Sequence, residues 1–570
     1  HAPCTYPLYG EALKRACLDE PDRLKRLGWS IRMHFNIADL FERVVDAMPQ
    51  TLAQVCEQRP LTTPEMDQRA NRLANYWQSL GFGQGDHIGL QLRNGSEYIE
   101  GMLAAYKIRA VPININYNYV EGELAYIYDN ADLVGLVCHR EFLPRAAAVA
   151  ADLKKLTNIL CVEDDSGVAS PGVESPGLES PGVDVPGVES PGVVAPSFCH
   201  AYETVLGSAS AAREFGERSD DDLYIVYTGG TTGMPKGVMW RHVDIFFSAM
   251  GGGDPDNSKG PITAPEQIVD RIPEMEMAAL PTPPFMHAAA QWLAMNTLFA
   301  AGKLVIPANG EFDAERILRA VSDEKVLLIV IVGDAMATPL CDELAAHPDR
   351  YDTSSLFAIA SGGALFSPAT KNRVLELLPG RMIIDGLGSS ETGAMGNKLS
   401  AASGDSDQPR FMVGDSMTVL DEKDQPVEPG SGVIGRLAKK GHVPLGYYKA
   451  AEKSAETIVE INGVRWAIPG DMASVEEDGS IMLHGRGSTS INTGGEKVFP
   501  EEVEAALKAH PDIADTLVVG IPVERWCQSV GALDRSLSNE ELDLGEVRDF
   551  CRGTIAGFKA PRSLVRLVAI

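Results

Sequence analysis

The segment from Tyr227 to Val238 combines residue types that bind phosphate. It reads Tyr-Thr-Gly-Gly-Thr-Thr-Gly-Met-Pro-Lys-Gly-Val, and the apolar run from Leu223 to Tyr227 predicts a buried strand leading into it. Glycines let successive backbone N–H groups turn toward one concavity, hydroxyls add donors, and a lysine adds a positive charge. The Gly-Lys-Ser/Thr ending of a Walker A loop is missing, and Gly-rich surface turns rarely combine so many donors. We therefore predict a phosphate-binding loop. Its expected residues are Thr228, Gly229, Gly230, Thr231, Thr232, Gly233 and Lys236.

Two further Gly-containing loops are expected at the same edge of a sheet. The runs Val326–Val332, Leu356–Ala360 and Arg381–Asp385 read as buried strands. The loops Ser361–Leu365 and Gly386–Thr392 follow the last two of them. Open parallel sheets bind ligands at the carboxyl ends of their strands. We therefore expect these loops and the phosphate loop to converge on one crevice.

The elements that must position these loops alternate between helix and strand. An amphipathic helix is predicted over Ile37–Val45, and a second one has Thr63 as its expected N-cap, Pro64 in its first turn and Gly81 past its end. Strands and helices then alternate from 87 to 138, which indicates a parallel sheet with crossover helices. The apolar stripe of the second helix consists of Ala70, Leu73, Ala74, Trp77 and Leu80.

Two segments depart from this alternation. From Ser170 to Pro196 the chain repeats Ser-Pro-Gly-Val-Glu and close variants, in which proline and glycine prevent helix and sheet while acidic positions favour solvation. We interpret 166–197 as a flexible insertion without a catalytic role. Residues 411–484 have short β-type runs and many turns, which predicts a compact β-rich subdomain.

Length, charge and cysteine content narrow the class of protein. A chain of 570 residues is expected to form several domains. Its formal net charge of −29 disfavours nucleic acid and anionic membrane surfaces as partners. The nine cysteines are scattered without a Cys-x-x-Cys pair, which predicts a cytoplasmic protein, and no apolar run has transmembrane length. Because the chain starts at His1 and not at Met, we expect it to be processed or a fragment, and the remaining sequence shows no signal-peptide pattern.

The segment Thr228–Gly237 resembles the phosphate loop of the adenylate-forming superfamily, which includes acyl-CoA synthetases, luciferases and nonribosomal-peptide adenylation domains. The resemblance extends from about Glu65 to the C-terminus, broken only by the repeat. It implies an α/β fold whose large N-terminal domain, 1–484, combines parallel-sheet subdomains with the β-rich one. A small, mobile α+β C-terminal domain would follow over 485–570. This domain is expected to be truncated, because the chain stops at Ile570 before the family's closing Gly-Lys motif.

The same resemblance implies catalytic roles for four residues. Thr232 and Lys236 would stabilise the triphosphate of ATP, and Glu391 would be the Mg²⁺ ligand. Glu391 could instead be a carboxylate at a helix N-terminus. His287 lies where the family gates its acyl pocket, although a histidine in this apolar segment could equally be a packed core residue. Weaker candidates for the acyl pocket are Gln291 and Trp292.

Further residues are implied in binding the nucleotide and coenzyme A. Backbone atoms of Ser361–Ala364 would contact adenine, Asp471 would accept the ribose hydroxyls, and Arg486 would bind ribose or phosphate. Ser488 falls at the family's hinge, and the glycines after it would line the pantetheine tunnel. The full expected set is Thr228, Gly229, Gly230, Thr231, Gly233, Gly362, Gly363, Ala364, Gly388, Ser390, Asp471, Arg486, Gly494 and Gly495.

Together these features predict an ATP-dependent acyl-CoA synthetase with Mg²⁺ and coenzyme A as cofactors. The segments Val238–His242 and Ile491–Lys497 are most similar to bacterial enzymes that activate fatty or steroid side-chain acids. One alternative is an acyl-AMP ligase that delivers to a carrier protein. Another is a degenerate nucleotide- or acyl-binding protein with weak adenylation, which Leu387, Ser488 and the missing lysine motif would suggest.

Overall fold

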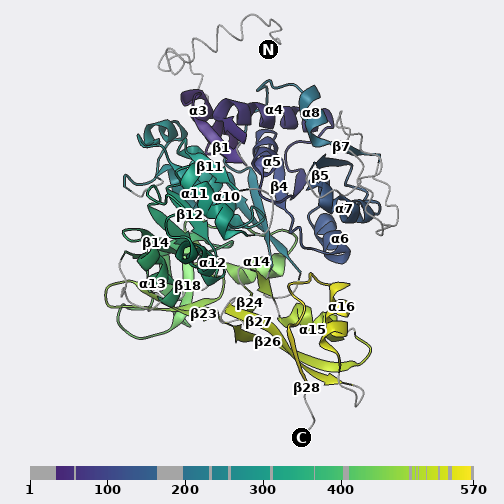
Figure 1. The fold of residues 1–570 in the computed structure, drawn as a ribbon, viewed down its shortest axis with the longest axis vertical. Helices are drawn as coiled ribbons and strands as arrows, with labels where there is room; N and C mark the ends of the chain where they lie inside the picture. Colours follow the sequence, from purple (N-terminus) through teal and green to yellow (C-terminus); the bar gives the residue numbers. More distant parts are fainter. Residues whose placement is uncertain are drawn as a thin grey trace, which may run out of the picture. The chain divides into compact units, whose positions relative to one another are not determined.

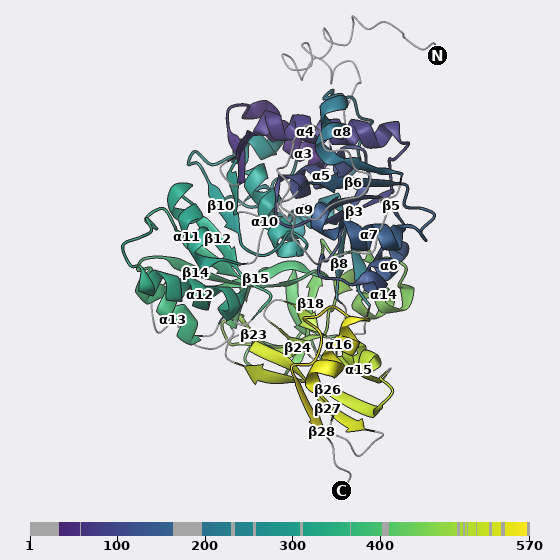
Figure 2. The same ribbon diagram turned by 45° about the vertical axis from the view of Figure 1, so that its right-hand side comes forward.

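Helices and strands alternate through most of the chain and form two large sheets with helices between and outside them (Figure 1; Figure 2). The described residues from Phe35 onward belong to one compact unit. The structure is a computed structural model. It describes residues 34–56, 59–163, 197–229, 234–254, 258–307, 312–364, 366, 368–401, 410–486, 491–493, 496–498, 500–508, 510–523, 527–536 and 542–566.

The first large sheet has eight strands in the order β19-β9-β8-β4-β3-β5-β6-β7. Strands β8, β4, β3, β5, β6 and β7 run parallel, whereas β9 is antiparallel to both β8 and β19. The bounds are β3 His87–Gln91, β4 Val111–Asn114, β5 Leu133–His139, β6 Asn158–Val162, β7 Cys199–Ala201, β8 Leu223–Thr228, β9 Lys236–Arg241 and β19 Gly446–Tyr447.

The second large sheet has fifteen strands, and its first half is mainly parallel. Strands β1, β11, β10, β12, β13 and β14 pair in parallel, with β2 antiparallel at the edge. This confirms the parallel strands predicted within Val326–Val332, Leu356–Ala360 and Arg381–Asp385. The bounds are β1 Leu52–Cys56, β2 Arg59–Thr62, β10 Ala278–Pro281, β11 Lys303–Ile306, β12 Leu328–Ile331, β13 Ala358–Ser361 and β14 Met382–Ser389.

The other half of this sheet is antiparallel, and most of it lies in the segment predicted to be β-rich. It continues from β14 through β15, β16, β23, β22, β18, β21 and β20, and β17 pairs with β18. The expected domain boundary at 484 lies within β23. The bounds are β15 Gly393–Ser400, β16 Arg410–Val413, β17 Met417–Leu420, β18 Gly435–Lys440, β20 Ile458–Ile461, β21 Val464–Ala467, β22 Asp471–Val475 and β23 Ile481–Arg486.

The C-terminal part of the chain has two small sheets of its own. Strands β24 Ile491–Asn492 and β25 Lys497–Val498 form an antiparallel pair, and β26, β27 and β28 form a three-stranded sheet. Helices α15 Pro500–Lys508 and α16 Leu544–Arg552 share an apolar cluster with this sheet. The three strands are β26 Ile513–Val523, β27 Cys527–Ser536 and β28 Ser563–Arg566.

Apolar clusters show that helices form three layers around the two parallel sheets. One layer packs between the sheets, one covers the outer face of the eight-stranded sheet, and one covers the outer face of the other. Between the sheets lie α3 Ile37–Ala47, α4 Thr63–Ser79, α5 Ser96–Lys107, α8 Tyr202–Ser208, α9 His242–Ala249 and α10 Ala288–Phe299. The outer helices are α6 Glu121–Asn130 and α7 Leu143–Ala150, and α11 Ala314–Asp323, α12 Gly333–Ala346 and α13 Pro368–Leu377. The 3₁₀ segment Pro265–Arg271 adds Ile268 to the central cluster. The remaining short elements are α14 Ala451–Thr457 and the 3₁₀ segments Arg140–Phe142 and Gly251–Gly253.

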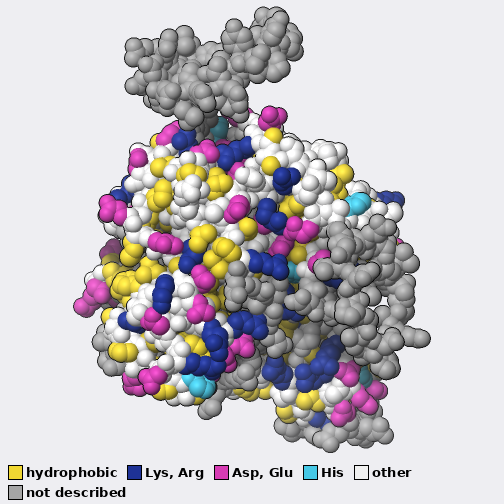
Figure 3. All heavy atoms as spheres, turned by 45° about the horizontal axis from the view of Figure 1, so that its top comes forward, with side chains coloured by type: hydrophobic (Ala, Val, Ile, Leu, Met, Phe, Trp, Pro, Cys, Tyr) yellow, Lys and Arg dark blue, Asp and Glu magenta, His cyan; other side chains and the backbone are white. Residues whose placement is uncertain are grey.

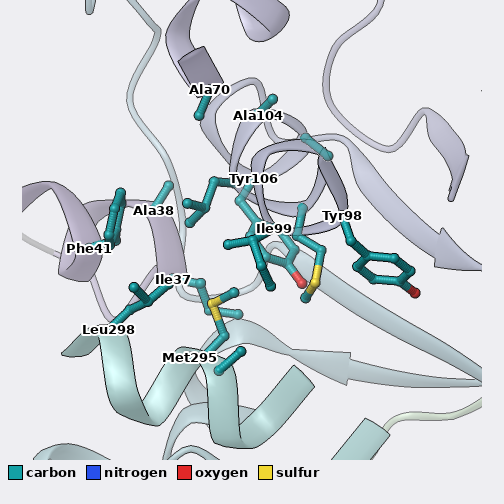
Figure 4. Packing of buried hydrophobic residues seen from close by; sticks show 14 of the residues in the cluster. Ile37, Ala38, Phe41, Ala70, Tyr98, Ile99, Ala104, Tyr106, Met295 and Leu298 are labelled. Atoms are coloured by element: carbon teal, nitrogen blue, oxygen red, sulfur yellow. The ribbon is translucent and has the colours of Figure 1, made fainter. Parts of the chain in front are cut away.

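The central layer is closely packed at the contact between α3, α5 and α10 (Figure 4). Ile37 and Phe41 of α3 and Ile99 of α5 are fully buried, and Met295 and Leu298 of α10 lie against the same cluster. Burying side chains of this size contributes roughly 1.5–3 kcal/mol each relative to leaving them exposed. The amphipathic helix predicted at Ile37 is therefore confirmed as part of the core.

The start of α4 corrects one sequence expectation. Its N-cap is Thr62, not Thr63: the Glu65 N–H donates to the Thr62 hydroxyl, and the Thr62 N–H donates to the Glu65 carboxylate over 2.8 Å. This reciprocal capping box selects the threonine three residues before a glutamate. Leu80 is also wrong as a member of the apolar stripe, because it follows the last helical turn and is 44% exposed.

The face of the molecule drawn in Figure 3 carries charged side chains of both signs. In Figure 3, Lys and Arg side chains gather in the lower half of the face shown, with Asp and Glu side chains among them. Among the residues that the structure describes, no helix is long and apolar enough to cross a membrane. The predicted insertion at 166–197 lies, apart from Ser197, outside the described residues.

Candidate functional site

The predicted phosphate loop connects two antiparallel strands. Strand β8 ends at Thr228 and β9 begins at Lys236, and these two residues are partners in the ladder. Lys236 and Gly237, which the predicted loop included, therefore belong to β9, because residues 236–241 pair with β8. Gly237 is required by close packing: a Cβ there would lie 2.6 Å from the Tyr227 ring. Gly230, Thr231, Thr232 and Gly233 lie outside the described residues.

Lys236 is in an electrostatically unfavourable position for a cation. Partial burial and, second, the ammonium of Lys453 on α14 lower the pKa of Lys236. A lysine near a second lysine is stabilised when an anion binds between or beside them. This electrostatic environment fits a polyphosphate ligand.

The predicted acidic motif is a tight turn between β14 and β15. Gly386–Ser389 belong to β14, which continues beyond its parallel partner and pairs antiparallel with β15, so the expected longer loop is wrong. The Thr392 N–H donates to the Ser389 carbonyl over 3.2 Å, which places Ser390 and Glu391 at the corner. Glu391 does not begin a helix, so its alternative as a helix N-terminal carboxylate is excluded. Gly388 is needed by the turn itself, because a Cβ would lie 2.5 Å from the Gly393 carbonyl oxygen.

Both corner residues are held by side chains from the eight-stranded sheet. The Trp240 indole N–H donates to the Ser390 carbonyl over 3.0 Å, and the Tyr447 hydroxyl donates to Glu391 Oε1 over 2.9 Å. Trp240 lies on β9, the strand that begins at Lys236, and Tyr447 lies on β19, the neighbour of β9. The phosphate hairpin and the acidic turn are therefore joined through β9.

The adenine-side loop follows β13, next to β14. Ser361 pairs with Asp385, and the Gly333 N–H donates to the Ser361 hydroxyl over 3.0 Å. Gly363 has φ 82°, in the region that favours glycine. Its carbonyl accepts a hydrogen bond from the Asn492 side-chain amide over 3.0 Å. The structure thus brings Gly362, Gly363 and Ala364 next to the acidic strand and to the predicted hinge-following segment.

The predicted ribose-binding pair shares one ladder position. Asp471, at the start of β22, lies directly opposite Arg486, at the end of β23. Asp471 is buried, at 8% exposure. Two residues predicted separately from the sequence are therefore neighbours across an antiparallel pair. Gly494, Gly495 and Ser488 lie outside the described residues.

His287 precedes α10 and faces the C-terminal part of the chain. Its Nε2 lies 3.4 Å from Glu496 Oε1, and its side chain is 35% exposed, so it is not a fully packed core residue. Burial opposes the charged imidazolium, but the Glu496 carboxylate more than offsets this, and the pKa of His287 is raised. That Gln291 approaches the acyl group stays a prediction: it is 4% exposed, its amide N–H groups donate to the Tyr98 hydroxyl and the Phe285 carbonyl, and its amide oxygen accepts from the Tyr224 hydroxyl.

Three residues that hold the site were not predicted from the sequence. Trp240 and Tyr447 brace the turn, and Lys439 donates to the carbonyls of Thr392 and Ala394. Tyr447 lies 56 residues after its partner, and no motif links such positions. Leu387, one of the residues that suggested the degenerate-protein alternative, is buried in the apolar cluster of the β-rich segment.

Comparison with known proteins identifies the family. Residues 41–448 match the model of the AMP-binding enzyme, and residues 502–569 match the model of the AMP-binding enzyme C-terminal domain. The chain belongs to the AMP-binding enzyme family. This confirms the adenylate-forming superfamily that the phosphate-loop motif indicated.

Several relatives are similar over almost the whole chain. A protein of Mycobacterium marinum, described as a medium/long-chain-fatty-acid–CoA and 3-oxocholest-4-en-26-oate–CoA ligase, is 45% identical over 93% of this chain and 92% of its own. A 3-oxocholest-4-en-26-oate–CoA ligase of Rhodococcus rhodochrous is 42% identical over the same shares. Among solved structures, the amide bond synthetase of Marinactinospora thermotolerans has a TM-score of 0.72 at 19% identity, covering 93% of this chain and 96% of that one. The o-succinylbenzoate CoA synthetase of Bacillus subtilis has a TM-score of 0.71 at 18% identity, with 93% and 95% coverage. These two likenesses support the fold.

Proposed function

We propose that this chain is an AMP-forming acyl-CoA synthetase that activates a fatty or steroid side-chain acid. The structural observation that carries the proposal is the strand β9. It begins at Lys236 and, through Trp240, holds the turn with Glu391. A cationic loop and an acidic turn held by one strand suit a triphosphate with its metal. The family and the relatives named as acyl-CoA ligases support the same reaction and the acid class.

The reaction proceeds in two half-reactions. A carboxylate oxygen of the acid attacks the α-phosphorus of ATP, the bond from that phosphorus to the bridging oxygen breaks, and pyrophosphate leaves. The sulfur of coenzyme A then attacks the acyl carbonyl, its thiol proton is lost, and AMP leaves with the electron pair of the broken carbon–oxygen bond. Negative charge develops on the phosphates in the first step. Lys236 and the donors of residues 228–233 would stabilise it electrostatically.

The residues present fit Mg²⁺ as a cofactor. Among the described residues no group of three or more His, Cys, Asp or Glu side chains could hold a metal by itself. Mg²⁺ is often bound through one or two carboxylates together with substrate phosphates and water. The carboxylate of Glu391 gives one oxygen to Tyr447 and can offer the other to such an ion. When bound, Mg²⁺ would neutralise charge on the phosphates.

The remaining predicted residues take supporting roles in this proposal. Asp471 and Arg486 would bind the ribose, and the backbone of Gly362–Ala364 and the Gly388–Ser390 segment would line the nucleotide site. The glycines 494 and 495 would admit the pantetheine arm, and His287 would border the acyl group. A cytoplasmic location is supported by six cysteines that are free thiols, namely Cys56, Cys138, Cys161, Cys199, Cys341 and Cys551.

The test is a pyrophosphate-release screen over fatty, aromatic and steroid acids, each with and without coenzyme A. We expect pyrophosphate with fatty or steroid acids, and AMP plus acyl-CoA once coenzyme A is added. Pyrophosphate without coenzyme-A-dependent AMP release would instead indicate an acyl-AMP ligase that serves a carrier protein. ATP binding without pyrophosphate from any acid would indicate a binding protein and would contradict the proposal.

A further inference from the structure

A buried lysine from the β-rich segment contacts the turn that carries Glu391. Lys439, on β18, is 5% exposed. Its ammonium donates to the Ser248 hydroxyl and the Thr392 carbonyl, each over 2.7 Å, and to the Ala394 carbonyl over 2.8 Å. An ammonium has three N–H donors and no acceptor, so its hydrogen-bonding capacity is fully used.

The partners of Lys439 are all uncharged. Burying an ammonium without a carboxylate is costly, and an apolar side chain could occupy the same volume without that cost. Packing alone therefore does not account for a lysine here. What the ammonium supplies is three directed donors, two of which bind the backbone of a single short segment.

Ser248 of α9 completes this arrangement. Its hydroxyl donates to the Thr392 carbonyl over 3.0 Å, so its oxygen serves as the acceptor for Lys439. The Thr392 carbonyl thus receives two hydrogen bonds, which uses both its lone pairs. Gly393, next in sequence, has φ 64°, and a Cβ there would lie 2.4 Å from the Ser248 hydroxyl. The backbone that follows Glu391 therefore packs directly against Ser248 and Lys439.

Thr392 directly follows Glu391. Hydrogen bonds that hold the Thr392 carbonyl therefore also restrict the backbone that carries the Glu391 side chain. The other side of the turn is held by Trp240 at the Ser390 carbonyl and by Tyr447 at Glu391 Oε1. Trp240 and Tyr447 constrain the corner, and Lys439 and Ser248 constrain its exit. A metal ligand must be held to within fractions of an ångström, and supporting hydrogen bonds supply that precision.

We propose that Lys439 is a positioning residue that orients the Glu391 carboxylate toward the metal of a metal–ATP complex. The inference rests on the proposed function, which assigns Glu391 to that metal. Lys439 acts through the backbone at Thr392 and Ala394 and does not itself touch substrate. The neighbouring Lys440 is exposed, lies over the Trp466 ring at 5.5 Å, and provides a matched control.

The experiment measures Mn²⁺ binding by electron paramagnetic resonance in the presence of a non-hydrolysable ATP analogue. Binding of the analogue without metal is measured in parallel by calorimetry. For Lys439→Met we expect Mn²⁺ affinity to fall at least tenfold while metal-free analogue affinity stays within twofold of the wild type. Lys440→Met should change neither. Mn²⁺ affinity within twofold of the wild type in a folded Lys439→Met protein would overturn the inference.

Two further variants keep the test decisive. Ser248→Ala removes one donor to the Thr392 carbonyl without removing the lysine, and we expect an at least threefold loss of Mn²⁺ affinity. If Lys439→Met does not fold, an unchanged affinity in Ser248→Ala overturns the inference. Glu391→Gln tests the underlying assignment separately. If Glu391→Gln leaves the Mn²⁺ affinity unchanged, the metal assignment is wrong and the inference about Lys439 is wrong with it. If Glu391→Gln loses Mn²⁺ affinity but Lys439→Met does not, only the inference about Lys439 is overturned.

Discussion

Two buried lysines in this molecule have opposite surroundings. Lys107 of α5 is fully buried, and its ammonium lies 2.5 Å from Glu42 of α3 and 2.7 Å from Asp67 of α4. Lys439 is almost as buried but bonds only to a hydroxyl and two carbonyls. Burial lowers the pKa of Lys439 to about 8. One ammonium is balanced by two carboxylates, and the other is balanced by none among the residues described.

This difference indicates that the Lys107 charge stabilises the fold, whereas the Lys439 charge holds the backbone beside Glu391. Lys107 ties three helices of the central layer together, and Arg213 and Arg218 extend the same network to Asp67 and Glu42. A compensated cluster of this kind belongs to the folding of the core. Lys439 gains no such compensation, and its contacts converge on the backbone beside Glu391. Substituting Lys439 is therefore expected to weaken ligand binding rather than to destabilise the fold.

The largest effect on stability is expected from Lys107→Met. The substitution leaves two buried carboxylates without their shared ammonium, and breaking a buried ion pair typically costs about 3–5 kcal/mol. We expect a value near the lower end, because Arg213 and Arg218 still face these carboxylates. The free energy of unfolding in urea measures it. A loss below about 1 kcal/mol would show that Lys107 is not a structural charge.

The second prediction concerns stability at alkaline pH. The pKa of Lys439 falls from its usual 10.5 to about 8 on folding, so between these values the unfolded chain binds more protons. Stability from this group therefore rises as the pH increases from 8 to 10.5, by about 3 kcal/mol for a difference of about 2.5 pKa units.

The measurement compares unfolding free energies of the wild type and Lys439→Met across this pH range. The difference between the two proteins isolates Lys439 from other groups that titrate there. The variant should lack the rise. If the unfolding free energies of the two proteins changed with pH in the same way, folding would not lower the pKa of Lys439. The contrast with Lys107 would then disappear.

The smallest effect is expected from Lys440→Met. Lys440 is adjacent to Lys439 in sequence but exposed, and surface substitutions usually change stability by less than about 0.5 kcal/mol. Thermal unfolding at pH 7 is sufficient to measure it. If Lys440→Met destabilised the protein as much as Lys107→Met, burial would not be what distinguishes these lysines.

The sequence predicted the features that are local in the chain. The strand before Thr228, the helix at Ile37 and the β/α alternation were recognised because their residues are neighbours in sequence. The phosphate loop and the Glu391 motif were recognised for the same reason. The error at the start of α4 was a shift by one residue, from Thr62 to Thr63. Glu65 lies three residues after Thr62, and this spacing decides that Thr62 caps the helix.

The bracing of the site could not be predicted because it joins distant segments. Lys439 and Lys440 are adjacent lysines, and nothing in the sequence distinguishes them. Lys439 becomes a buried hydrogen-bond donor, and Lys440 stays on the surface, only because β18 packs against α9 and β15. Gly388 was expected to contact the nucleotide, yet its lack of a side chain is required by the Gly393 carbonyl. Such constraints arise only when the antiparallel strands come together.

The central claim is that Lys236 and Glu391 form one site for ATP and its metal. ATP–pyrophosphate exchange tests it most directly, using Glu391→Gln with the exposed Glu422→Gln as control. Loss of one electrostatic contact to the reacting phosphates typically lowers the rate about 100- to 1,000-fold. We predict that loss for Glu391→Gln and an unchanged rate for Glu422→Gln. Exchange at the wild-type rate in a folded Glu391→Gln protein would contradict the account.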